Sequence, residues 1–228
     1  MLSGGRTTPS VVRTGDVVRR PPGPNAAFVH ELLQYLDASG FPSAPRFLGL
    51  DETGREMLSF LTGEVPSDLG PFAVEQFVAA ARILRELHDL TARWDGRGAA
   101  DIVCHGDPSP CNFVFRQGQP YALIDFDAAH PGRRAEDVGY AAWLWLDIGN
   151  PELDPISQGG RLAEFTRSYG ALPLDAAVSS VLLAQAALAQ SGAAEGTRTW
   201  AARCREWTER NRARLESSYE VTGRPRTA

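Results

Sequence analysis

The hydrophobic residues of the first sixty positions come in short runs broken by turn residues, which is typical of strands. One longer segment instead has an apolar residue every three or four positions, which predicts a helix. The predicted elements are, in chain order, strand 10–13, strand 16–20, helix 26–38 with Asn25 as its N-cap, strand 46–50 and strand 56–61. This order predicts a small sheet with one helix packed against it.

Beyond residue 62 the pattern changes to helical periodicity. Glycine and proline residues between positions 62 and 70 separate the two parts, so we place a lobe boundary there. Residues 71–90 have the spacing of a helix with one apolar face. Further predicted helices cover residues 160–169, 175–190 and 197–218. The expected fold class is α+β, with a small N-terminal lobe of residues 1–62 and a mainly helical C-terminal lobe of residues 63–228.

A hairpin is predicted inside the C-terminal lobe. The apolar runs 112–115 and 121–124 flank a turn around Gly118. The start of one antiparallel strand and the end of its partner lie at the same edge of the pair. Asn112 and Asp125 should therefore lie close together.

Asp107, Asn112 and Asp125 are the candidate chemical groups of the chain. Asp107 lies in the loop just before the hairpin, so it joins the other two side chains. Carboxylate and amide oxygens are ligands that Mg²⁺ takes when it also bridges substrate phosphates. A carboxylate in the preceding loop can accept the proton of an attacking hydroxyl or orient that hydroxyl. Together these groups predict phosphoryl transfer, which needs mostly positioning and charge neutralisation.

Composition adds expectations about setting and partners. The formal net charge of −5 disfavours nucleic-acid binding. No apolar stretch approaches the roughly 18 residues of a membrane span, and no N-terminal segment resembles a secretory signal. The three cysteines have neither zinc-ligand spacing nor the even number of a disulfide framework, which favours a cytoplasmic setting. Every basic residue is an arginine, and eight of them lie between positions 198 and 226 with four glutamates, which we interpret as a solvated helix face with ion pairs.

The motifs around Asp107 resemble those of the aminoglycoside phosphotransferase family, which is related to the protein kinases. His105-Gly106-Asp107 precedes Asn112 by five positions, and Asp125-Phe126-Asp127 begins thirteen positions after Asn112. Asp137 resembles the buried aspartate with which this family braces its catalytic loop. The resemblance covers residues 103–139 and implies a two-lobed, protein-kinase-like fold.

The same resemblance implies roles for the site residues. Asp107 would be the catalytic base or the residue that orients the hydroxyl, and His105 would shape the catalytic loop. Asn112 and Asp125 would hold Mg²⁺ on the phosphates of ATP (or GTP). Asp127 would be a further metal ligand.

The N-terminal lobe departs from the kinase pattern. Only Gly4-Gly5 stands where a glycine-rich phosphate loop would lie, and the phosphate-contacting lysine of the third strand is missing. Arg19 is our candidate replacement, with Arg20 on the opposite face of the strand as the alternative. Glu31 on the first helix is the expected partner of either arginine. The segment Phe60, Leu61 and Thr62 would contact the adenine, chiefly through backbone groups.

The expected function is ATP- and magnesium-dependent transfer of the γ-phosphate to a hydroxyl of a small molecule. The shortened first lobe leaves an alternative open, a catalytically weak or inactive protein that acts in toxin immunity or as a regulatory binder. The terminal helix is basic, which favours a small hydroxylated metabolite over a polycationic aminoglycoside as acceptor. Candidates for an acceptor pocket are Trp143, Trp145, Asp147 and Trp200, unless Trp143 and Trp145 belong to the core.

Overall fold

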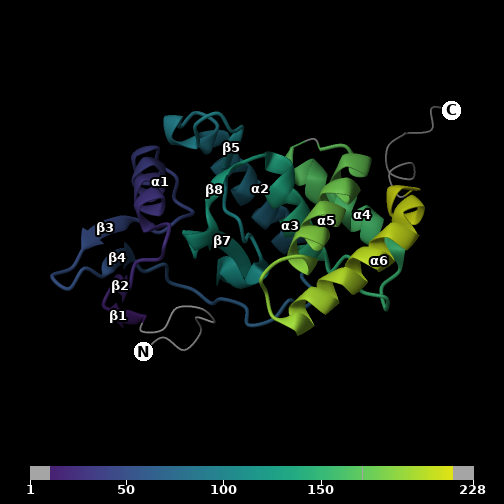
Figure 1. The fold of residues 1–228 in the computed structure, drawn as a ribbon, viewed down its shortest axis with the longest axis horizontal. Coiled ribbons are helices and arrows are strands. Elements are labelled where there is room, and N and C mark those ends of the chain that lie inside the picture. Colours follow the sequence, from purple (N-terminus) through teal and green to yellow (C-terminus); the bar gives the residue numbers. More distant parts are fainter. Residues whose placement is uncertain (1–10, 171, 218–228) are drawn as a thin grey trace.

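A computed structural model describes residues 11–170 and 172–217. Its first part is a four-stranded antiparallel sheet in the order β1-β2-β4-β3, at the left in Figure 1. The strands are β1 (Val12–Thr14), β2 (Val17–Arg20), β3 (Phe47–Leu50) and β4 (Glu56–Ser59). Their ends agree with the predicted strands to within two residues, and position 10 lies outside the described residues.

Helix α1 (Ala26–Ala38) has the predicted bounds. It buries one apolar face made of Val29, Leu32, Leu33 and Leu36. Asn25 occupies the N-cap position, but its side chain does not cap the helix. The side-chain Nδ2 of Asn25 instead donates to the carbonyl of Ala129 at 2.8 Å. The start of α1 is therefore tied to the segment that follows the Asp125 motif.

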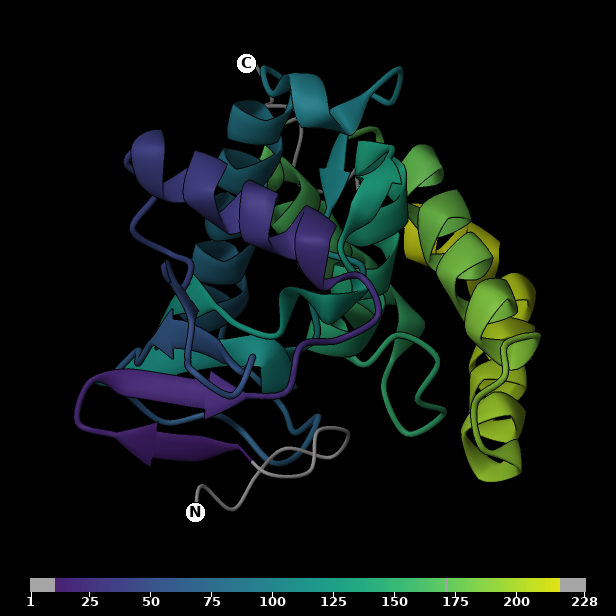
Figure 2. The same ribbon diagram turned by 60° about the vertical axis from the view of Figure 1, so that its left-hand side comes forward.

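The second part is mainly helical, as the sequence predicted. Its helices are α2 (Val74–Thr91), α3 (Arg134–Leu146), α4 (Pro155–Tyr169), α5 (Leu174–Ala189) and α6 (Glu195–Ser217). Helix α5 packs against both α3 and α6, and Figure 2 shows α5 and α6 as an outer layer at the right. The hydrophobic pattern did not delimit α3, because residues 141–146 are all buried and show no polar face. The last position of the final predicted helix, 218, lies outside the described residues.

Two short antiparallel pairs lie between the sheet and the helices. The predicted hairpin is formed by β6 (Phe113–Arg116) and β7 (Gln119–Leu123). The second pair, β5 (Ile102–Cys104) with β8 (His130–Gly132), was not predicted, because its strands have three residues each and are far apart in the sequence. Three single-turn helices lie beside these strands, η1 (Asp95–Arg97), η2 (Pro110–Asn112) and η3 (Phe126–Ala128).

The segment that joins the sheet to the helices is anchored on β6 and β7. The Glu64 N–H donates to the Phe115 carbonyl at 2.9 Å, and the Phe115 N–H donates to the Glu64 carbonyl at 2.7 Å. Gly63 allows this close approach, since a Cβ there would lie 2.3 Å from the Phe115 oxygen. The sheet is thus held at a defined distance from the hairpin that carries the candidate site.

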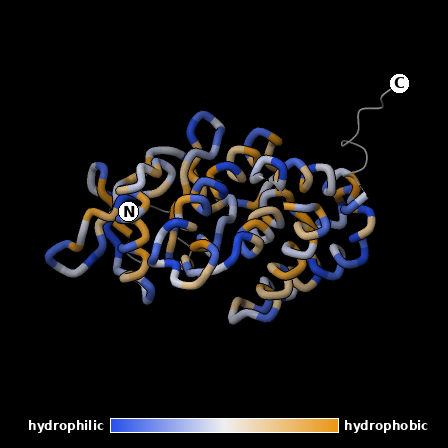
Figure 3. The backbone as a smooth tube through the Cα atoms, turned by 90° about the horizontal axis from the view of Figure 1, so that it is seen from above, coloured by the Kyte–Doolittle hydropathy of each residue, from blue (hydrophilic) through white to orange (hydrophobic). Residues whose placement is uncertain are grey.

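The hydropathy of the chain varies along the molecule. The turn between β3 and β4, at the left end of the molecule, is hydrophilic and is blue in Figure 3. Among the described residues no single helix has the length and hydropathy to cross a bilayer, although α4 and α5 meet those criteria jointly, across a bend of 100°.

Candidate active site

The catalytic loop that begins at His105 is braced from helix α3. Asp137 is buried at 2% exposure. Its carboxylate accepts the backbone N–H of His105 at 2.6 Å and that of Gly106 at 3.0 Å. His88 on α2 lies 3.0 Å from the same carboxylate. Asp137 therefore has the bracing position that the family resemblance implied.

The brace is a charged group held in the interior. Burial alone would raise the pKa of Asp137, but the contacts with His88, His105 and the Gly106 N–H outweigh it and lower the pKa. A buried carboxylate that keeps its charge holds its hydrogen-bond donors firmly. The loop backbone at His105 and Gly106 is therefore fixed before any substrate binds.

His105 shapes the loop from inside. Its side chain is fully buried, and its Nε2 lies 3.0 Å from the carbonyl of Ile124, the residue before Asp125. Burial lowers the pKa of His105, although the carboxylates of Asp137, Asp107 and Asp125 oppose this shift. A neutral, buried imidazole that bridges two loops fits a positioning role and has no access to a substrate.

Asp107 is held by its backbone and keeps one carboxylate oxygen available. The side-chain amide of Asn112 donates to the Asp107 carbonyl at 2.9 Å. The indole N–H of Trp145 donates to the carbonyl of Pro108 at 3.2 Å. Within residues 11–170 and 172–217, the buried Oδ1 of Asp107 has no hydrogen-bond partner. An unsatisfied acceptor of this kind is where the hydroxyl of a substrate would donate.

Tyr140 is a site neighbour that the sequence did not reveal. It lies close to Asp107, and the pKa of Tyr140 is raised, first by burial and then by the Asp107 charge. A family motif would not reveal this contact, because Tyr140 lies on α3, one turn after Asp137.

Asp125 follows β7 in a left-handed backbone conformation, with φ of 64°. This conformation is uncommon for a residue with a side chain, and it persists where the surroundings enforce it. Burial and the neighbouring Asp127 raise the pKa of Asp125, while Arg20 opposes the shift. The Ile124 N–H donates to the Asn112 carbonyl at 2.9 Å, which brings Asp125 to the edge that carries Asn112 and Asp107. The backbone segments that carry the three residues therefore meet at one edge, and the convergence of their side chains around a cation stays a prediction.

Arg20, and not Arg19, lies in the site. Its Nη1 lies 3.2 Å from Asp125 Oδ1 and 3.0 Å from Asp127 Oδ2, and its Nη2 contacts the other oxygen of Asp127. Arg19 points to the opposite face of β2, with its Nε 3.8 Å from Asp51. The structure therefore favours Arg20, our alternative, over Arg19 as the phosphate-contacting cation, because strand alternation directs Arg20 inward.

Glu56 pairs with Arg20 in place of Glu31. The Arg20 Nε contacts Glu56, its cross-strand neighbour on β4. Glu56 is buried at 1% exposure and also lies 2.7 Å from His30 Nε2. Glu31 is exposed, so the expected pairing of Glu31 with an arginine of β2 is not formed. The register of β2 on β4 decides this partner, and short-range sequence patterns do not give that register.

The predicted hinge segment follows β4. The Phe60 N–H donates to the Asp16 carbonyl at 2.8 Å, and the Thr62 carbonyl accepts the hydroxyl of Tyr121 at 2.9 Å. In the described part of the chain, the backbone groups of Leu61 have no hydrogen-bond partner. Of the three residues, Leu61 therefore has both its N–H and its carbonyl available to a purine base.

The metal-binding prediction can be compared with the donor atoms that the site offers. Asn112 uses its amide nitrogen internally, so its oxygen is the atom left for a cation. Asp125 contacts Arg20 through Oδ1, which leaves Oδ2, and its side chain is 38% exposed. Asn112 and Asp125 thus fit a magnesium ion, which prefers oxygen ligands. Both oxygens of Asp127 face Arg20, so its role as a metal ligand remains a prediction. Gly4 and Gly5 lie outside the described residues.

Two of the three tryptophans proposed for an acceptor pocket belong to the core, and the third packs against it. Trp143 and Trp145 are each 1% exposed. Trp200 on α6 stacks on Trp143, with ring centroids 4.8 Å apart. The alternative interpretation of these residues, as core, is confirmed for Trp143 and Trp145.

Comparison with known sequences places this geometry in a family. The sequence matches the phosphotransferase enzyme family (APH) over residues 2–101 and 90–172. The chain belongs to this family. The match covers both the N-terminal sheet and the catalytic and metal-binding motifs, so the expected kinase-like phosphotransferase fold is confirmed.

Solved structures of the same family share the fold at low sequence identity. The gentamicin complex of APH(2″)-IIa has a TM-score of 0.56 and 13% identity, and the alignment covers 94% of this chain and 92% of that one. The spectinomycin phosphotransferase APH(9)-Ia, in complex with ADP and spectinomycin, has a TM-score of 0.52 and 12% identity, with 99% and 88% of the two chains covered. At this identity the similarity concerns the fold alone.

A relative of higher sequence identity is named as an immunity protein and not as a phosphotransferase. The trifolitoxin immunity protein of Rhizobium leguminosarum bv. trifolii is 41% identical over 160 residues, which are 63% of this chain. The alignment spans 60% of that relative's length.

Proposed function

We propose that this phosphotransferase-family protein transfers the γ-phosphate of ATP or GTP to a hydroxyl of a small molecule, with Mg²⁺ as cofactor. The observation that carries the proposal is that Asn112 is hydrogen-bonded both to the Asp107 loop and to the strand end before Asp125, beside a loop braced by the buried Asp137. Asp107 Oδ1 is unsatisfied within residues 11–170 and 172–217, and Asn112 and Asp125 each have an oxygen free for a cation. The ADP-bound relative APH(9)-Ia supports the use of a nucleotide.

Each residue has a distinct task in this proposal. Asp107 accepts a hydrogen bond from the acceptor hydroxyl and orients it towards the phosphate, and it can take the hydroxyl proton as transfer proceeds. Asn112 and Asp125 would hold a magnesium ion, which supplies charge neutralisation at the phosphates when bound. Arg20 is the cation of β2 that lies nearest to this position, and Leu61 offers backbone groups to the base.

The test is calorimetric titration of the full chain with ATP, with and without Mg²⁺, beside an Asp125→Ala variant. Magnesium should strengthen nucleotide binding in the parent protein and have little effect in the variant. A parent protein that binds nucleotide equally well with and without Mg²⁺ contradicts the proposed metal role.

A screen of hydroxyl compounds for ADP release then identifies the acceptor. With that acceptor, Asp107→Asn should lower the turnover by about 10²-fold or more while nucleotide binding persists.

The acceptor class is a separate part of the proposal. Three of the six arginines of α6 pair along the helix, Arg205 with Glu209 and Arg212 with Glu216 at 2.8 Å and Arg210 with Glu206 at 3.7 Å. Helix α6 thus carries ion pairs of the predicted kind and still has more arginines than glutamates, which disfavours a polycationic acceptor. We propose a small hydroxylated metabolite as acceptor, and the screen should include aminoglycosides as the competing class.

A second candidate function is toxin immunity, which the 41% identity to the trifolitoxin immunity protein favours. Expression of the chain in a trifolitoxin-sensitive strain tests it, with Asp107→Asn and Asp125→Ala as matched variants. Protection that survives both substitutions supports a binding protein without catalysis. Protection lost in both supports immunity through phosphoryl transfer, and an absence of protection by the parent protein contradicts the immunity function.

A further inference from the structure

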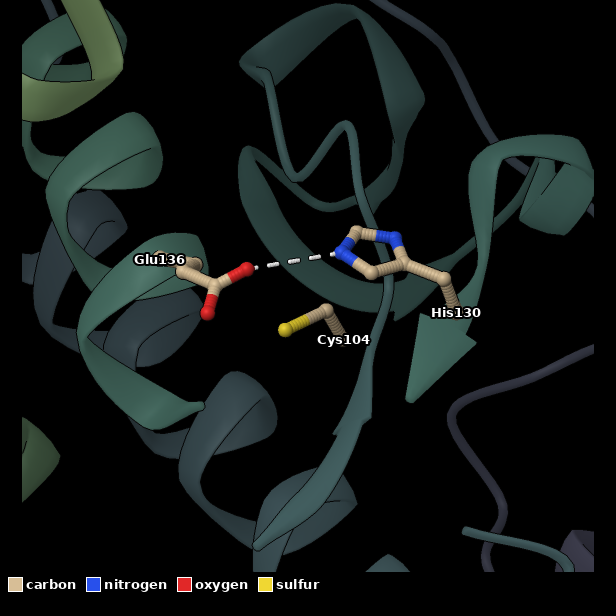
Figure 4. A group of neighbouring side chains, drawn as sticks. All are labelled: Cys104, His130 and Glu136. Carbon is tan, nitrogen blue, oxygen red and sulfur yellow. Dashed lines mark ion pairs between the residues drawn. The ribbon is translucent and has the colours of Figure 1, made fainter. Parts of the chain in front are cut away.

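Three side chains outside the candidate active site converge behind the catalytic loop. Cys104 ends β5, His130 begins β8, and Glu136 lies in the first turn of α3. Cys104 and His130 are cross-strand neighbours. The thiol, one imidazole nitrogen and one carboxylate oxygen all lie within 4.8 Å of one another. Figure 4 shows the three groups directed towards a common point, with His130 Nε2 3.6 Å from Glu136 Oε2.

The neighbours of His130 and Glu136 orient these two side chains as a metal site requires, and the Cys104 thiol lies 3.5 Å from the Arg133 carbonyl. His130 Nδ1 lies 2.9 Å from the carbonyl of Ala128, which accepts its N–H. This bond leaves the lone pair of Nε2 for a ligand, as in most metal-binding histidines. Glu136 Oε1 accepts the backbone N–H of Arg133 at 3.2 Å, so Oε2 remains directed at the cluster. These two hydrogen bonds thus leave His130 Nε2 and Glu136 Oε2 free to bind an ion.

Glycine at position 132 keeps the space between the three groups open. A Cβ on Gly132 would lie 2.7 Å from Cys104 Sγ, 3.2 Å from Glu136 Oε2 and 3.4 Å from His130 Nε2. Any side chain at this position would therefore press on all three groups. The backbone of β8 passes close to the cluster without obstructing it.

We propose that Cys104, His130 and Glu136 bind one zinc ion, with a fourth position open to water. Thiolate, imidazole and carboxylate together suit Zn²⁺, with bonds of about 2.0–2.3 Å, and a thiol ligand disfavours Mg²⁺ and Ca²⁺. Binding replaces the S–H bond of Cys104 by a sulfur–zinc bond, and the proton leaves to solvent. His130 and Glu136 have side chains 48% and 43% exposed, so the ion has an entry path.

The proposed ion would fasten the structure just before the catalytic loop. Cys104 directly precedes His105, and Glu136 directly precedes the bracing residue Asp137. One ion bound to all three ligands would join β5, β8 and α3, the elements from which the loop is held. Zinc is therefore expected to stabilise the folded chain, because a ligand that binds only the folded state raises its stability.

Cobalt titration tests the site, because Co²⁺ reports its own ligands spectroscopically. The reduced, metal-stripped full chain should bind one equivalent of Co²⁺ with a thiolate-to-cobalt charge-transfer band, and Zn²⁺ should displace it. Cys104→Ser should abolish the band. His130→Gln and Glu136→Gln should weaken binding by at least about tenfold, and glutamine keeps the oxygen that accepts the Arg133 N–H.

Two control variants separate this site from others in the molecule. Cys204→Ser removes a different buried thiol, and Asp125→Asn changes the proposed magnesium ligand, so both should keep the cobalt band. The proposal is overturned if the parent protein shows no band, or if the band survives Cys104→Ser or is lost in Cys204→Ser. If Cys104→Ser does not fold, the variants of the two half-exposed ligands are used in its place. Parent-like Co²⁺ affinity in both His130→Gln and Glu136→Gln excludes the site. A plain ion pair between protonated His130 and Glu136 predicts no band in any variant.

Discussion

Single side chains connect the sheet to the catalytic motifs. Arg20 contacts Glu56 within the sheet and also the two aspartates Asp125 and Asp127 of the helical part. The surrounding carboxylates raise the pKa of Arg20 although burial opposes this, so the group is a fixed positive charge. The planar guanidinium of an arginine can bind two carboxylates at once, which a lysine ammonium does less well. One guanidinium facing three carboxylates leaves the site with a surplus of negative charge before a nucleotide binds.

Arg20→Gln should destabilise the protein and weaken nucleotide binding. Removing one partner of a buried ion pair leaves the other charge uncompensated, here that of Glu56, and costs about 3 kcal/mol or more. Urea unfolding measures the loss, and calorimetry measures the affinity. Arg19→Gln is the matched control. Arg19 is the adjacent residue on the opposite face of β2, and its one carboxylate contact, with Asp51, is long at 3.8 Å. Equal effects of the two substitutions would contradict the assignment of Arg20 to the site.

Packing between elements decides positions that local propensity would assign differently. Gly139 lies inside α3, where glycine is normally unfavourable. A Cβ on Gly139 would lie 2.3 Å from the carbonyl oxygen of Ser180 on α5. The glycine lets α3, which carries Asp137, approach α5 closely. The contact between helices thus outweighs the helix propensity of the residue.

Gly139→Ala should destabilise the protein by about 1–3 kcal/mol, because the added methyl group forces the two helices apart. Gly160→Ala on α4 makes the same chemical change where no atom lies within 4 Å. That variant should be more stable than the parent by about 0.5–1 kcal/mol, through reduced freedom of the unfolded chain. Thermal unfolding of both variants checks the prediction, and a stabilising Gly139→Ala would show that α3 and α5 are not closely packed.

The ion pairs of Asp89, one within α2 and one to α3, should depend on pH. Asp89 accepts from Arg85 on its own helix and pairs with Arg134 of α3, each at 2.7 Å. Partial burial would raise the pKa of Asp89, but the two arginines outweigh this and lower it. A group with a lowered folded-state pKa stabilises the protein above its ordinary pKa of about 3.9, and this contribution is lost as the pH falls through the folded-state value.

The measurement is the urea midpoint of the parent and of Asp89→Asn at several pH values. The difference between the two should be present at neutral pH and should shrink below about pH 4. Asp101→Asn, at an exposed position, should show little difference at any pH. A constant difference for Asp89→Asn between pH 7 and pH 3 would exclude the electrostatic origin.

At the scale of the whole molecule, the candidate nucleotide site lies where the two parts meet. Arg20 and Leu61 come from the sheet and its exit, whereas Asp107 and Asp125 come from the loops around β6 and β7. The bridge between Glu64 and Phe115 and the bond from Asn25 to Ala129 hold these parts together on either side. A ligand bound here would contact both parts at once.

Hydrogen exchange with and without ATP and Mg²⁺ should therefore show joint protection. The amides of β2 and those around Asp125 are expected to slow together when the nucleotide binds, while those of α6 remain unchanged. The Asp125→Ala variant serves as the control without a complete metal site. Protection confined to one of the two parts would contradict a site shared between them.

The sequence by itself determined the local elements, the motif order and the family, because helix and strand periodicity and the spacing of Asp107, Asn112 and Asp125 are properties of short segments. It also brought Asn112 and Asp125 together correctly, since a hairpin turn defines which strand ends meet. Only the tertiary structure chose Arg20 over Arg19, gave it Glu56 as a partner in place of Glu31 and placed Trp143 and Trp145 in the core. It alone joined Cys104 to His130 and Glu136, because β5 pairs with β8 across a long intervening segment. Strand register and helix packing are set by contacts between distant segments, and no local pattern encodes them.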